Sequence, residues 1–456
     1  MSLVSKNPAT EEIIKEHREF TDEELNQKLQ VAHDTFLNWR ETFFAHRAER
    51  MKRLAQLLRE NARHYGELMA LEMGKPIKQG IAEAEKCAWV CEFYAAEAEK
   101  FLAPEYVKTD AGESFVRFEP IGAVLAVMPW NFPFWQVFRF IAPAAMAGNV
   151  GVLKHASNVQ GCAQAIEELF DKAGFPQGVF QNLAIGSDKV AGVIADPRIE
   201  AVTLTGSEGA GRKVAEAAGR EIKKTVLELG GSDPFIILAD ANLDQACTVA
   251  TTARLQNNGQ SCIAAKRFIA VESVAGEFLQ RFKERFEAMV VGDPLDEKTD
   301  VGPLVSERAL QDIEDQIKRT LEAGAKLVIG GKRKEEMRKG YFYTPTILSE
   351  VKKGMPAYSE EIFGPVASVI TVADVDEAVA VANDTRFGLG ASLWTQDLAL
   401  AKKLAAQIDA GAVFINGMVK SDPRLPFGGV KRSGYGRELG EYGIKEFTNI
   451  KTVWIK

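Results

Sequence analysis

Residues 123–155 read AVLAVMPWNFPFWQVFRFIAPAAMAGNVGVLKH, and this stretch decides the class of fold. The apolar run from Ala123 to Met128 predicts a buried strand, and a second run from Val150 to Leu153 predicts another. Between them lie a loop bounded by prolines and a segment typical of a buried helix. A strand, a helix and a strand in this order predict two parallel strands joined by a crossover connection.

The same stretch has so few charges that it resembles a membrane span. Arg139 is the only charged side chain from Pro120 to Leu153. Prolines break a continuous helix and amide side chains are costly in lipid, and the stretch contains both: Pro129, Pro133, Pro143, Asn131, Gln136 and Asn149. We therefore expect a buried strand, loop and helix, and no membrane partner.

Further apolar runs continue this pattern on the C-terminal side. Runs at 179–184 and 201–205 are each followed by a helical pattern, which predicts a parallel sheet with its ligand at the C-terminal ends of the strands. After Gly230 a second set of runs predicts a second α/β domain, at 235–238, 268–271, 366–372 and 412–415. No repeat or long linker separates the two sets, so we expect closely packed domains.

The two ends of the chain have other patterns. The first hundred residues read as helices, one of them opened by Asp22. Alternating apolar and polar residues at 106–109 and 115–118 predict a β-hairpin. The last ten residues, 447–456, are apolar and typical of a strand, and such an edge needs a partner to avoid aggregation. Pairing with a subunit is the simplest arrangement.

Length, charge and cysteine content limit the function classes. A chain of 456 residues is long enough for more than one compact core, and its net charge of -7 provides no general basic field for nucleic acid. Five cysteines are too few and too scattered for a disulfide framework, and the N-terminus lacks the pattern of a signal peptide. We expect a cytoplasmic protein with free thiols that does not bind nucleic acid.

Cys262 is the strongest candidate for a reactive group. It lies in NNGQSCIA, residues 257–264, where glycine and small polar residues leave room around a thiol. The other cysteines lie on helical patterns and are interpreted as structural: Cys87, Cys91, Cys162 and Cys247. No His or Cys ligands accompany Cys87 and Cys91, so no metal site is predicted. Taken alone, Cys262 also fits a buried apolar side chain.

Glu228 is the candidate base. Four of the five histidines lie in the helical N-terminal region, which disfavours a Cys-His hydrolase. Glu228 follows an apolar run in LELGG, residues 227–231, where burial would raise its pKa and suit it to act as a base near neutral pH. A carboxylate that caps a neighbouring loop is the alternative.

A glycine-rich turn at residues 206–211, GSEGAG, lies between a predicted strand and a predicted helix. Backbone N–H groups at such a turn can approach a phosphate at the positive end of the helix. The spacing is Gly-x-x-Gly-x-Gly, which an ordinary tight turn explains equally well.

Six motifs in order make the whole chain resemble the aldehyde dehydrogenase superfamily. They are PWNFP at 129–133, the turn at 206–211, LELGG at 227–231, GQSC at 259–262, EIFGP at 361–365 and PFGG at 426–429. The resemblance implies that Cys262 is the nucleophile and Glu228 the general base, with the Asn131 amide and the Cys262 backbone N–H as the oxyanion hole. It also implies a cofactor site of Pro129, Trp130, Lys154, Ser157, Gly206, Ser207, Gly211, Leu229, Glu361 and Phe363.

The resemblance further implies an α/β fold with two Rossmann-like domains and a small β oligomerisation element. The cofactor-binding domain would comprise residues 1–105 and 119–230, and the catalytic domain residues 231–435. The oligomerisation element would comprise residues 106–118 and 436–456, and the protein would be a homodimer or homotetramer.

Ser157 bears on the choice of cofactor. NAD-preferring members of the superfamily commonly have an acidic residue at this place, which accepts hydrogen bonds from the adenosine ribose. A hydroxyl beside Lys154 leaves space and positive charge for a 2′-phosphate, so we expect NADP to be preferred, with NAD also used. The alternative is that Ser157 only caps the following helix.

Arg139 bears on the substrate. By the resemblance it faces the aldehyde tunnel, together with Ser421 and Phe427, and an unpaired buried guanidinium needs an anion. We therefore expect a small aldehyde that bears a carboxylate, and the nearest resemblance is to the succinate-semialdehyde dehydrogenases. Glutarate semialdehyde and a catalytically silent relative of the fold are the alternatives, as is pairing of Arg139 with an internal Asp or Glu.

Overall fold

A six-stranded sheet occupies the first half of the computed structural model, which describes residues 3–456. The strand order is β17-β9-β8-β5-β6-β7, parallel except for β17. Its strands are β5 (Ala123–Met128), β6 (Val150–His155), β7 (Phe180–Asn182), β8 (Ile199–Thr205), β9 (Lys224–Glu228) and β17 (Gly434–Tyr435). The parallel sheet predicted from residues 123–155 is confirmed, and β5 has the predicted bounds.

A seven-stranded sheet follows in the second half of the chain. Its order is β12-β13-β14-β11-β10-β15-β16, and only β12 is antiparallel to its neighbour. Its strands are β10 (Asp233–Ile237), β11 (Ala265–Val271), β12 (Lys326–Ile329), β13 (Thr346–Ser349), β14 (Val366–Val372), β15 (Gly390–Trp394) and β16 (Ala412–Ile415). The fold is therefore of the predicted α/β class, with two parallel sheets.

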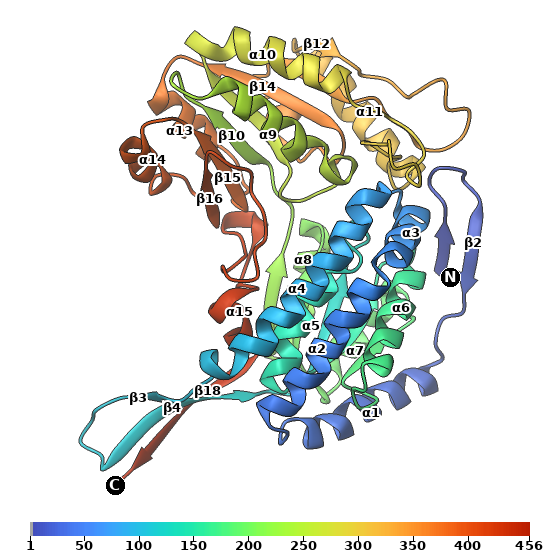
Figure 1. Ribbon diagram of the computed structural model, residues 1–456, viewed down its shortest axis with the longest axis vertical. Coiled ribbons are helices and arrows are strands. Elements are labelled where there is room, and N and C mark those ends of the chain that lie inside the picture. The colour runs from blue at the N-terminus through green and yellow to red at the C-terminus, as the bar shows by residue number, and fades with distance from the viewer. Residues whose placement is uncertain (1–2) are drawn as a thin grey trace.

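Helices cover both sheets (Figure 1). The first sheet is accompanied by α1 (Asp22–Trp39), α2 (Phe44–Glu60), α3 (Ala62–Met73), α4 (Ile77–Phe101), α5 (Trp135–Ala147), α6 (Gln160–Lys172), α7 (Val190–Ala195) and α8 (Glu208–Arg220). The second has α9 (Leu243–Leu255), α10 (Glu272–Glu287), α11 (Glu307–Glu322), α12 (Pro356–Ser359), α13 (Val375–Asn383) and α14 (Leu398–Ala405). On β10, Ile236 packs in a core with α11, α13 and α14, whereas Phe235 and Ile237 pack with α9 and α10. Alternating residues of one strand thus face two separate apolar layers.

Helix α5 departs from one expectation. Pro143 lies inside the helix rather than at a break, and every residue of α5 is buried. The helix has 13 residues, too few to cross a bilayer, and begins only after Pro129 and Pro133. Within residues 3–456 no helix combines the length and apolar character that crossing a membrane requires.

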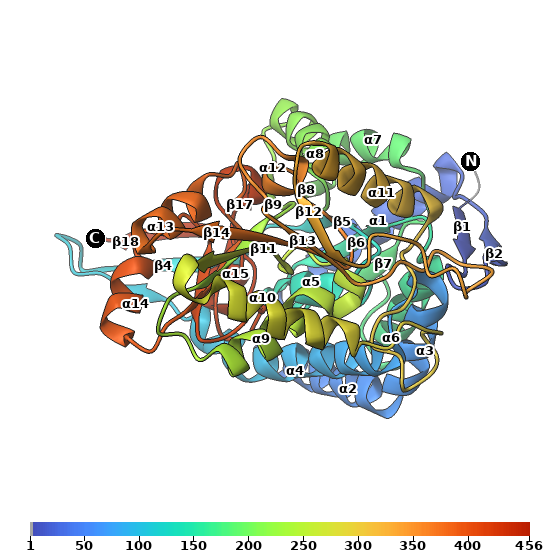
Figure 2. The same cartoon turned by 90° about the horizontal axis from the view of Figure 1, so that it is seen from above.

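Two small antiparallel sheets complete the fold. An N-terminal hairpin that the sequence patterns did not predict joins β1 (Leu3–Lys6) to β2 (Ile13–His17). The predicted hairpin is present as β3 (Glu105–Tyr106) and β4 (Glu113–Pro120), and the C-terminal strand β18 (Thr448–Ile455) pairs with β4 of its own chain. This three-stranded sheet projects from the body as an arm (Figures 1 and 2). Before it, α15 (Gly440–Glu446) packs against α4 and α5.

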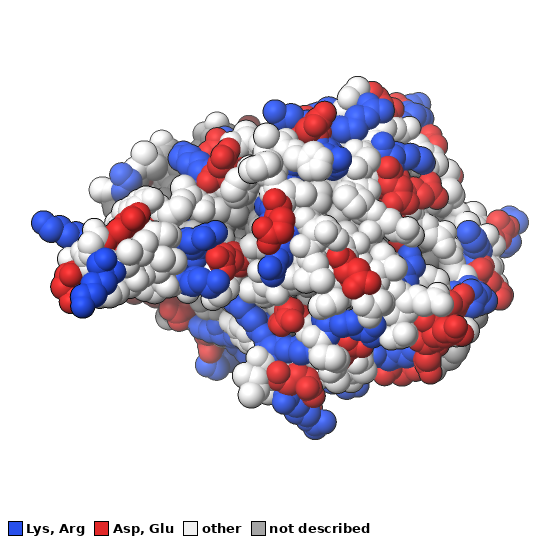
Figure 3. Space-filling view, turned by 90° about the horizontal axis from the view of Figure 1, so that it is seen from below, with Lys and Arg blue, Asp and Glu red and all other residues white. Residues whose placement is uncertain are grey.

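Charged side chains of both signs share the surface. On the face seen from below, lysines and arginines are intermixed with aspartates and glutamates (Figure 3). Many are paired along helices, such as Arg212 with Glu208 and Arg281 with Glu277. A surface of mixed sign on this face offers no continuous track for a polyphosphate backbone.

A buried ion pair fixes the start of α5. Glu83 of α4 accepts hydrogen bonds from the backbone N–H groups of Phe134, at 3.0 Å, and Trp135, at 2.9 Å. The other Glu83 oxygen is paired with the ammonium group of Lys75, and both side chains are buried. A carboxylate at a helix N-terminus favours the helix dipole, and the lysine supplies the counter-charge that burial demands.

Replacing Lys75 should therefore destabilise the protein strongly. In Lys75→Met the Glu83 carboxylate stays buried without a counter-ion, and we expect the free energy of unfolding to fall by about 3–5 kcal/mol. Denaturant unfolding measures this. Lys78→Met is the matched control, because Lys78 is exposed and its ammonium lies 3.7 Å from Asp300. Similar small losses in both variants would show that the pair contributes little.

Candidate functional site

A cavity of about 290 Å³ opens at the C-terminal ends of three strands of the first sheet. Pro129 follows β5, Gly206 follows β8 and Leu229 follows β9, which is the edge where a parallel sheet presents a ligand. The full lining is Pro129, Trp130, Asn131, Gln136, Thr205, Gly206, Ser207, Leu229, Gly230, Cys262, Glu361 and Phe363. Nine of the thirteen catalytic and cofactor residues expected from the sequence therefore lie around one cavity.

Cys262 reaches this cavity through a loop that follows α9. Asn257 and Asn258 have left-handed backbones, with φ of 53° and 59°, and Gly259 has φ of 72°. A side chain at Gly259 would collide with the backbone oxygen of Gly364, which a Cβ would approach to 2.2 Å. The GQSC and EIFGP motifs therefore pack directly on each other, and glycine is required for the close approach.

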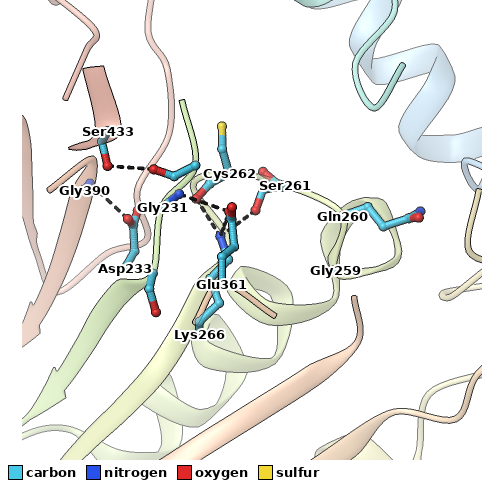
Figure 4. A network of polar contacts seen from close by, with 12 residues as sticks. Gly231, Asp233, Gly259, Gln260, Ser261, Cys262, Lys266, Glu361, Gly390 and Ser433 are labelled. Atoms are coloured by element: carbon cyan, nitrogen blue, oxygen red, sulfur yellow. Dashed lines mark hydrogen bonds and ion pairs between the residues drawn. The ribbon is translucent and has the colours of Figure 1, made fainter. Parts of the chain in front are cut away.

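Two residues that sequence reasoning missed hold this loop. Asn257 donates from its side-chain amide to the backbone oxygen of Asn131, at 2.7 Å. Lys266 of β11 donates to the backbone oxygens of Ser261, at 2.8 Å, and Cys262, at 2.6 Å (Figure 4). Two adjacent cations, Lys266 and Arg267, inside the otherwise apolar strand β11 were the available signal.

Glu361 faces the cavity from the other side of the loop. Its Oε1 accepts from the backbone N–H of Gly231 at 3.0 Å and lies 3.3 Å from the ammonium of Lys266 (Figure 4). The carboxylate expected to hold a cofactor ribose is thus oriented by the same lysine that holds the backbone at Cys262. The Lys266 ammonium therefore contacts both the Cys262 loop and the Glu361 carboxylate.

The amide of Asn131 is oriented for donation into the cavity. Gln136 donates to Asn131 Oδ1 at 3.0 Å, so the carbonyl end of the amide is occupied. Its Nδ2 donates one proton to the backbone oxygen of Gln260 at 3.0 Å. The second Nδ2 proton is left for a ligand beside Cys262, as an oxyanion hole requires.

Glu228 lies buried at the end of β9. Neither of its carboxylate oxygens has a hydrogen-bond partner, and burial raises its pKa to about 8. The nearby Arg139 charge opposes this rise and the Glu438 carboxyl adds to it. The predicted upward shift is present, and the group can accept a proton near neutral pH.

The Cys262 thiol is protonated in this state. Burial raises its pKa to about 12, against the lowering effect of the Arg139 and Lys266 charges. Cys262 is the only partly exposed cysteine among residues 3–456, and all five thiols are free. The thiol is therefore accessible from the cavity but needs a base to become a nucleophile.

The glycine-rich turn forms the predicted junction between β8 and α8. Ser207 caps α8, its Oγ accepting from the backbone N–H of Ala210 at 3.3 Å. A Cβ on Gly211 would come within 2.8 Å of both Leu229 methyl groups, so a larger residue here would require the Leu229 side chain to move. Trp130 and Phe363 meet edge to face with ring centroids 5.8 Å apart and form an apolar wall. The N-terminus of α8 suits the phosphates of a dinucleotide, and the Trp130 and Phe363 wall suits its rings.

Lys154 and Ser157 lie outside the lining of this cavity. Lys154 is buried in β6, one residue before its end, and burial lowers the pKa of Lys154 while the Asp188 and Glu19 charges oppose the fall. Ser157 is exposed in the turn that follows β6. Helix α6 begins after Val159 without a side-chain cap, so the alternative that Ser157 caps it is not what the structure shows.

Arg139 requires a correction. The expectation of an unpaired buried guanidinium is wrong, because Arg139 forms a buried ion pair with Glu438. It also donates to Thr205 Oγ1 at 3.3 Å and lies over the Phe427 ring at 4.6 Å. The internal carboxylate that was the alternative is present, and its distance along the chain from Arg139 is why no local pattern predicted it.

Ser421 and Arg139 have different partners. Ser421 Oγ accepts from Lys86 Nζ and from Trp135 Nε1, each at 2.9 Å. Phe427 is buried beneath Arg139. The expected grouping of Arg139 with Ser421 around a substrate is therefore not formed by direct contact.

Alkylation should single out Cys262. Iodoacetamide needs an accessible thiolate, so the label should fall on Cys262 and be absent from Cys262→Ala. Because the pKa of the thiol is about 12, we expect the rate to rise about tenfold per pH unit from pH 7 to 10. Peptide mass spectrometry identifies the alkylated cysteine and measures the rate of its alkylation. A plateau near pH 7 would show a stabilised thiolate instead.

Comparisons with known proteins agree with this geometry. Residues 2–453 match the aldehyde dehydrogenase family. The chain is 56% identical to a probable succinate-semialdehyde dehydrogenase [NADP(+)] of Synechocystis sp. and 51% identical to succinate-semialdehyde dehydrogenase [NADP(+)] 1 of Mycobacterium tuberculosis, with 100% of each chain covered.

Solved structures show the same relationship. The crystal structure of succinic semialdehyde dehydrogenase from Streptococcus pyogenes in complex with NADP+ superposes with a TM-score of 0.97 at 41% identity, covering 99% of both chains. An NADP-dependent enzyme of E. coli superposes with a TM-score of 0.97 at 33% identity, covering 100% of this chain and 95% of that one. With the family match over nearly its whole length, the chain belongs to the aldehyde dehydrogenase family.

Proposed function

We propose that this protein oxidises succinate semialdehyde to succinate with NADP as the preferred cofactor and NAD as a second one. The observation that carries the chemistry is one cavity that contains both the Cys262 thiol and the Asn131 amide, with the buried Glu228 next to its Leu229 wall. The names of the relatives with 51–56% identity support the substrate and the cofactor.

The first step joins the substrate to the enzyme. Cys262 Sγ adds to the aldehyde carbon once the thiol proton has passed to solvent. The carbonyl oxygen becomes an oxyanion that accepts hydrogen bonds from Asn131 Nδ2 and the Cys262 backbone N–H. Gln136 and the Gln260 carbonyl keep the Asn131 amide in this orientation.

A nicotinamide bound here would supply a hydride acceptor for the former aldehyde carbon, and Cys262 would then carry a thioester. The residues suited to hold the cofactor are Ser207 at the N-terminus of α8, the Trp130 and Phe363 wall, and Glu361. Lys154 and Ser157 lie outside the cavity lining, and they would offer a cation and a hydroxyl to a 2′-phosphate.

Hydrolysis completes the reaction. Glu228 takes a proton from water as the water oxygen attacks the thioester carbon, and the Cys262 sulfur leaves. The products are a carboxylic acid and the free thiol, which needs one proton back. The presence of Cys262, Asn131 and a base whose pKa is raised to about 8 favours an active enzyme over a silent relative of the fold.

We also infer a cytoplasmic homodimer or homotetramer that uses the β3-β4-β18 arm. Strand β18 lies at the edge of its sheet and exposes Ile450, Trp454 and Ile455. An apolar edge strand of this kind favours pairing with another copy of the chain. Five free thiols fit a reducing compartment.

Removing the base should separate the two halves of the reaction. With Glu228→Gln we expect a burst of reduced cofactor followed by slow turnover, because the thioester forms but is hydrolysed slowly. In the unchanged enzyme, turnover should rise with pH through about 8, as the carboxyl loses its proton. Stopped-flow absorbance at ~340 nm, the band of reduced nicotinamide, measures both. A linear time course without a burst would contradict the role of Glu228.

Ser157→Glu should move cofactor preference toward NAD. The added carboxylate repels a 2′-phosphate and accepts hydrogen bonds from ribose hydroxyls. Steady-state kcat/KM for the two cofactors gives the ratio, which should favour NADP before the change and shift by about tenfold or more after it. Ser273→Glu, at an exposed position on α10, is the control and should leave the ratio unchanged. A starting preference for NAD would contradict the proposal.

A further inference from the structure

The peptide unit between Ser261 and Cys262 carries one of the two donors of the oxyanion hole. Its N–H belongs to Cys262, and no acceptor for that N–H is found among residues 3–456. Its carbonyl oxygen belongs to Ser261. In a trans peptide the C=O and the N–H point in opposite directions, and none of the peptide bonds in the described chain is cis. A group that holds the Ser261 carbonyl therefore also sets the direction of the Cys262 N–H.

Lys266 holds that carbonyl. Its ammonium donates to Ser261 O at 2.8 Å and to Cys262 O at 2.6 Å, and it lies 3.3 Å from Glu361 Oε1. An ammonium has three N–H groups, and these three acceptors occupy all of them. Lys266 does not line the cavity that contains Cys262, and its ammonium lies on the other side of the loop from the Cys262 sulfur (Figure 4). The Cys262 N–H is thus turned away from Lys266 and toward the side on which Cys262 lines the cavity.

Further contacts keep this peptide from rotating. Ser261 O also accepts from the backbone N–H of Ala264 at 3.2 Å. A Cβ on Gly231 would come within 2.7 Å of Cys262 O, so the end of the LELGG segment packs closely on that carbonyl. A rotation of the peptide would break the Lys266 and Ala264 hydrogen bonds together.

The other donor of the oxyanion hole is held on the neighbouring peptide. Asn131 Nδ2 donates to the carbonyl oxygen of Gln260, which belongs to the peptide directly before the Ser261–Cys262 unit. The two donors are therefore fixed relative to each other by bonds to consecutive peptides. Such donors stabilise an oxyanion only when they are aimed beforehand at the place where its charge develops.

The burial of Lys266 favours a role in the site over a role in stability. Every residue of β11 is buried, and burial lowers the pKa of Lys266 while the Glu361 charge opposes the fall. A buried ion pair commonly stabilises a fold no better than apolar side chains of the same volume. An ammonium at this place is explained by the two carbonyls that it holds.

We propose that Lys266 is a positioning residue of the oxyanion hole, which aims the Cys262 backbone N–H at the substrate oxygen by holding the carbonyl end of the same peptide. This inference rests on the proposed function and adds a residue to it. Lys266 does not contact the substrate and acts through the backbone of Cys262.

The test compares two reactions of the same thiol. Both aldehyde oxidation and alkylation by iodoacetamide need the Cys262 thiolate, but only oxidation passes through an oxyanion. The measured quantity is the rate of cofactor reduction in a single turnover at saturating NADP, divided by the rate of Cys262 alkylation at the same pH. In Lys266→Met we expect this ratio to fall about tenfold or more, because one oxyanion donor is no longer aimed.

Two further variants control for charge and for contact with the loop. Lys266→Arg keeps a cation with N–H donors and should keep most of the ratio. Arg254→Met is the matched control, because Arg254 is a second buried cation that donates to the same loop, but at the Gly259 carbonyl. It should leave the ratio unchanged.

The outcomes separate this inference from the proposed function. An unchanged enzyme that reduces neither NADP nor NAD with succinate semialdehyde overturns both. Equal losses of the two rates in Lys266→Met, or a fall of the ratio in Arg254→Met as large as in Lys266→Met, overturn the inference alone. Should Lys266→Met fail to melt cooperatively, Lys266→Gln replaces it, since its shorter amide cannot hold both carbonyls, and there an unchanged ratio overturns the inference.

Discussion

The left-handed loop at Asn257 and Asn258 is the constraint on which the rest of the site depends. Each such backbone costs on the order of 1–2 kcal/mol for a residue other than glycine. Both side chains offset that cost with buried hydrogen bonds, Asn257 to the Asn131 carbonyl and Asn258 to the Gly74 and Pro303 carbonyls. The Asn257 bond joins this loop, which leads into β11 of the seven-stranded sheet, to the segment that follows β5 of the six-stranded sheet, so Cys262 and Asn131 are brought together from different sheets.

Burial determines the resting charge of this site. The pKa of Glu228 rises to about 8 and that of Cys262 to about 12, so near pH 7 both reacting groups are largely neutral. Arg139 acts against both shifts, and its pairing with Glu438 moderates how far it does so. The Arg139 charge, held by its ion pair with Glu438, therefore influences the protonation of both Glu228 and Cys262.

Local patterns predicted the parts of the fold that are locally determined. Strands β5, β14 and β16 have the predicted bounds, since each is an apolar run bounded by turn residues. Strand β15, GASLW, was missed because glycine and serine interrupt its apolar pattern.

Local sequence patterns did not predict the contacts between residues that are distant along the chain. The partner of Arg139 is Glu438, and the Lys266 ammonium holds carbonyls of a loop whose path depends on two left-handed residues. The motifs predicted which residues surround the cavity, but not which of them pair with one another. Those pairings depend on how the two sheets pack. The expectation that Arg139 has no internal counter-ion was wrong because its partner, Glu438, is distant in the sequence.

Helix α4 contributes to the wall of a second, larger cavity, of about 600 Å³, and also holds the segment that lines the cavity containing Cys262. Glu83 holds the backbone at Phe134 and Trp135, next to the segment that presents Asn131, and Lys86 lies three residues further along α4 on the same face. A shift of α4 would thus move the oxyanion donor and the cation of the larger cavity together. Because Lys75 and Glu83 lock that helix in place, the distance between the two groups is fixed by buried side chains rather than by a mobile loop.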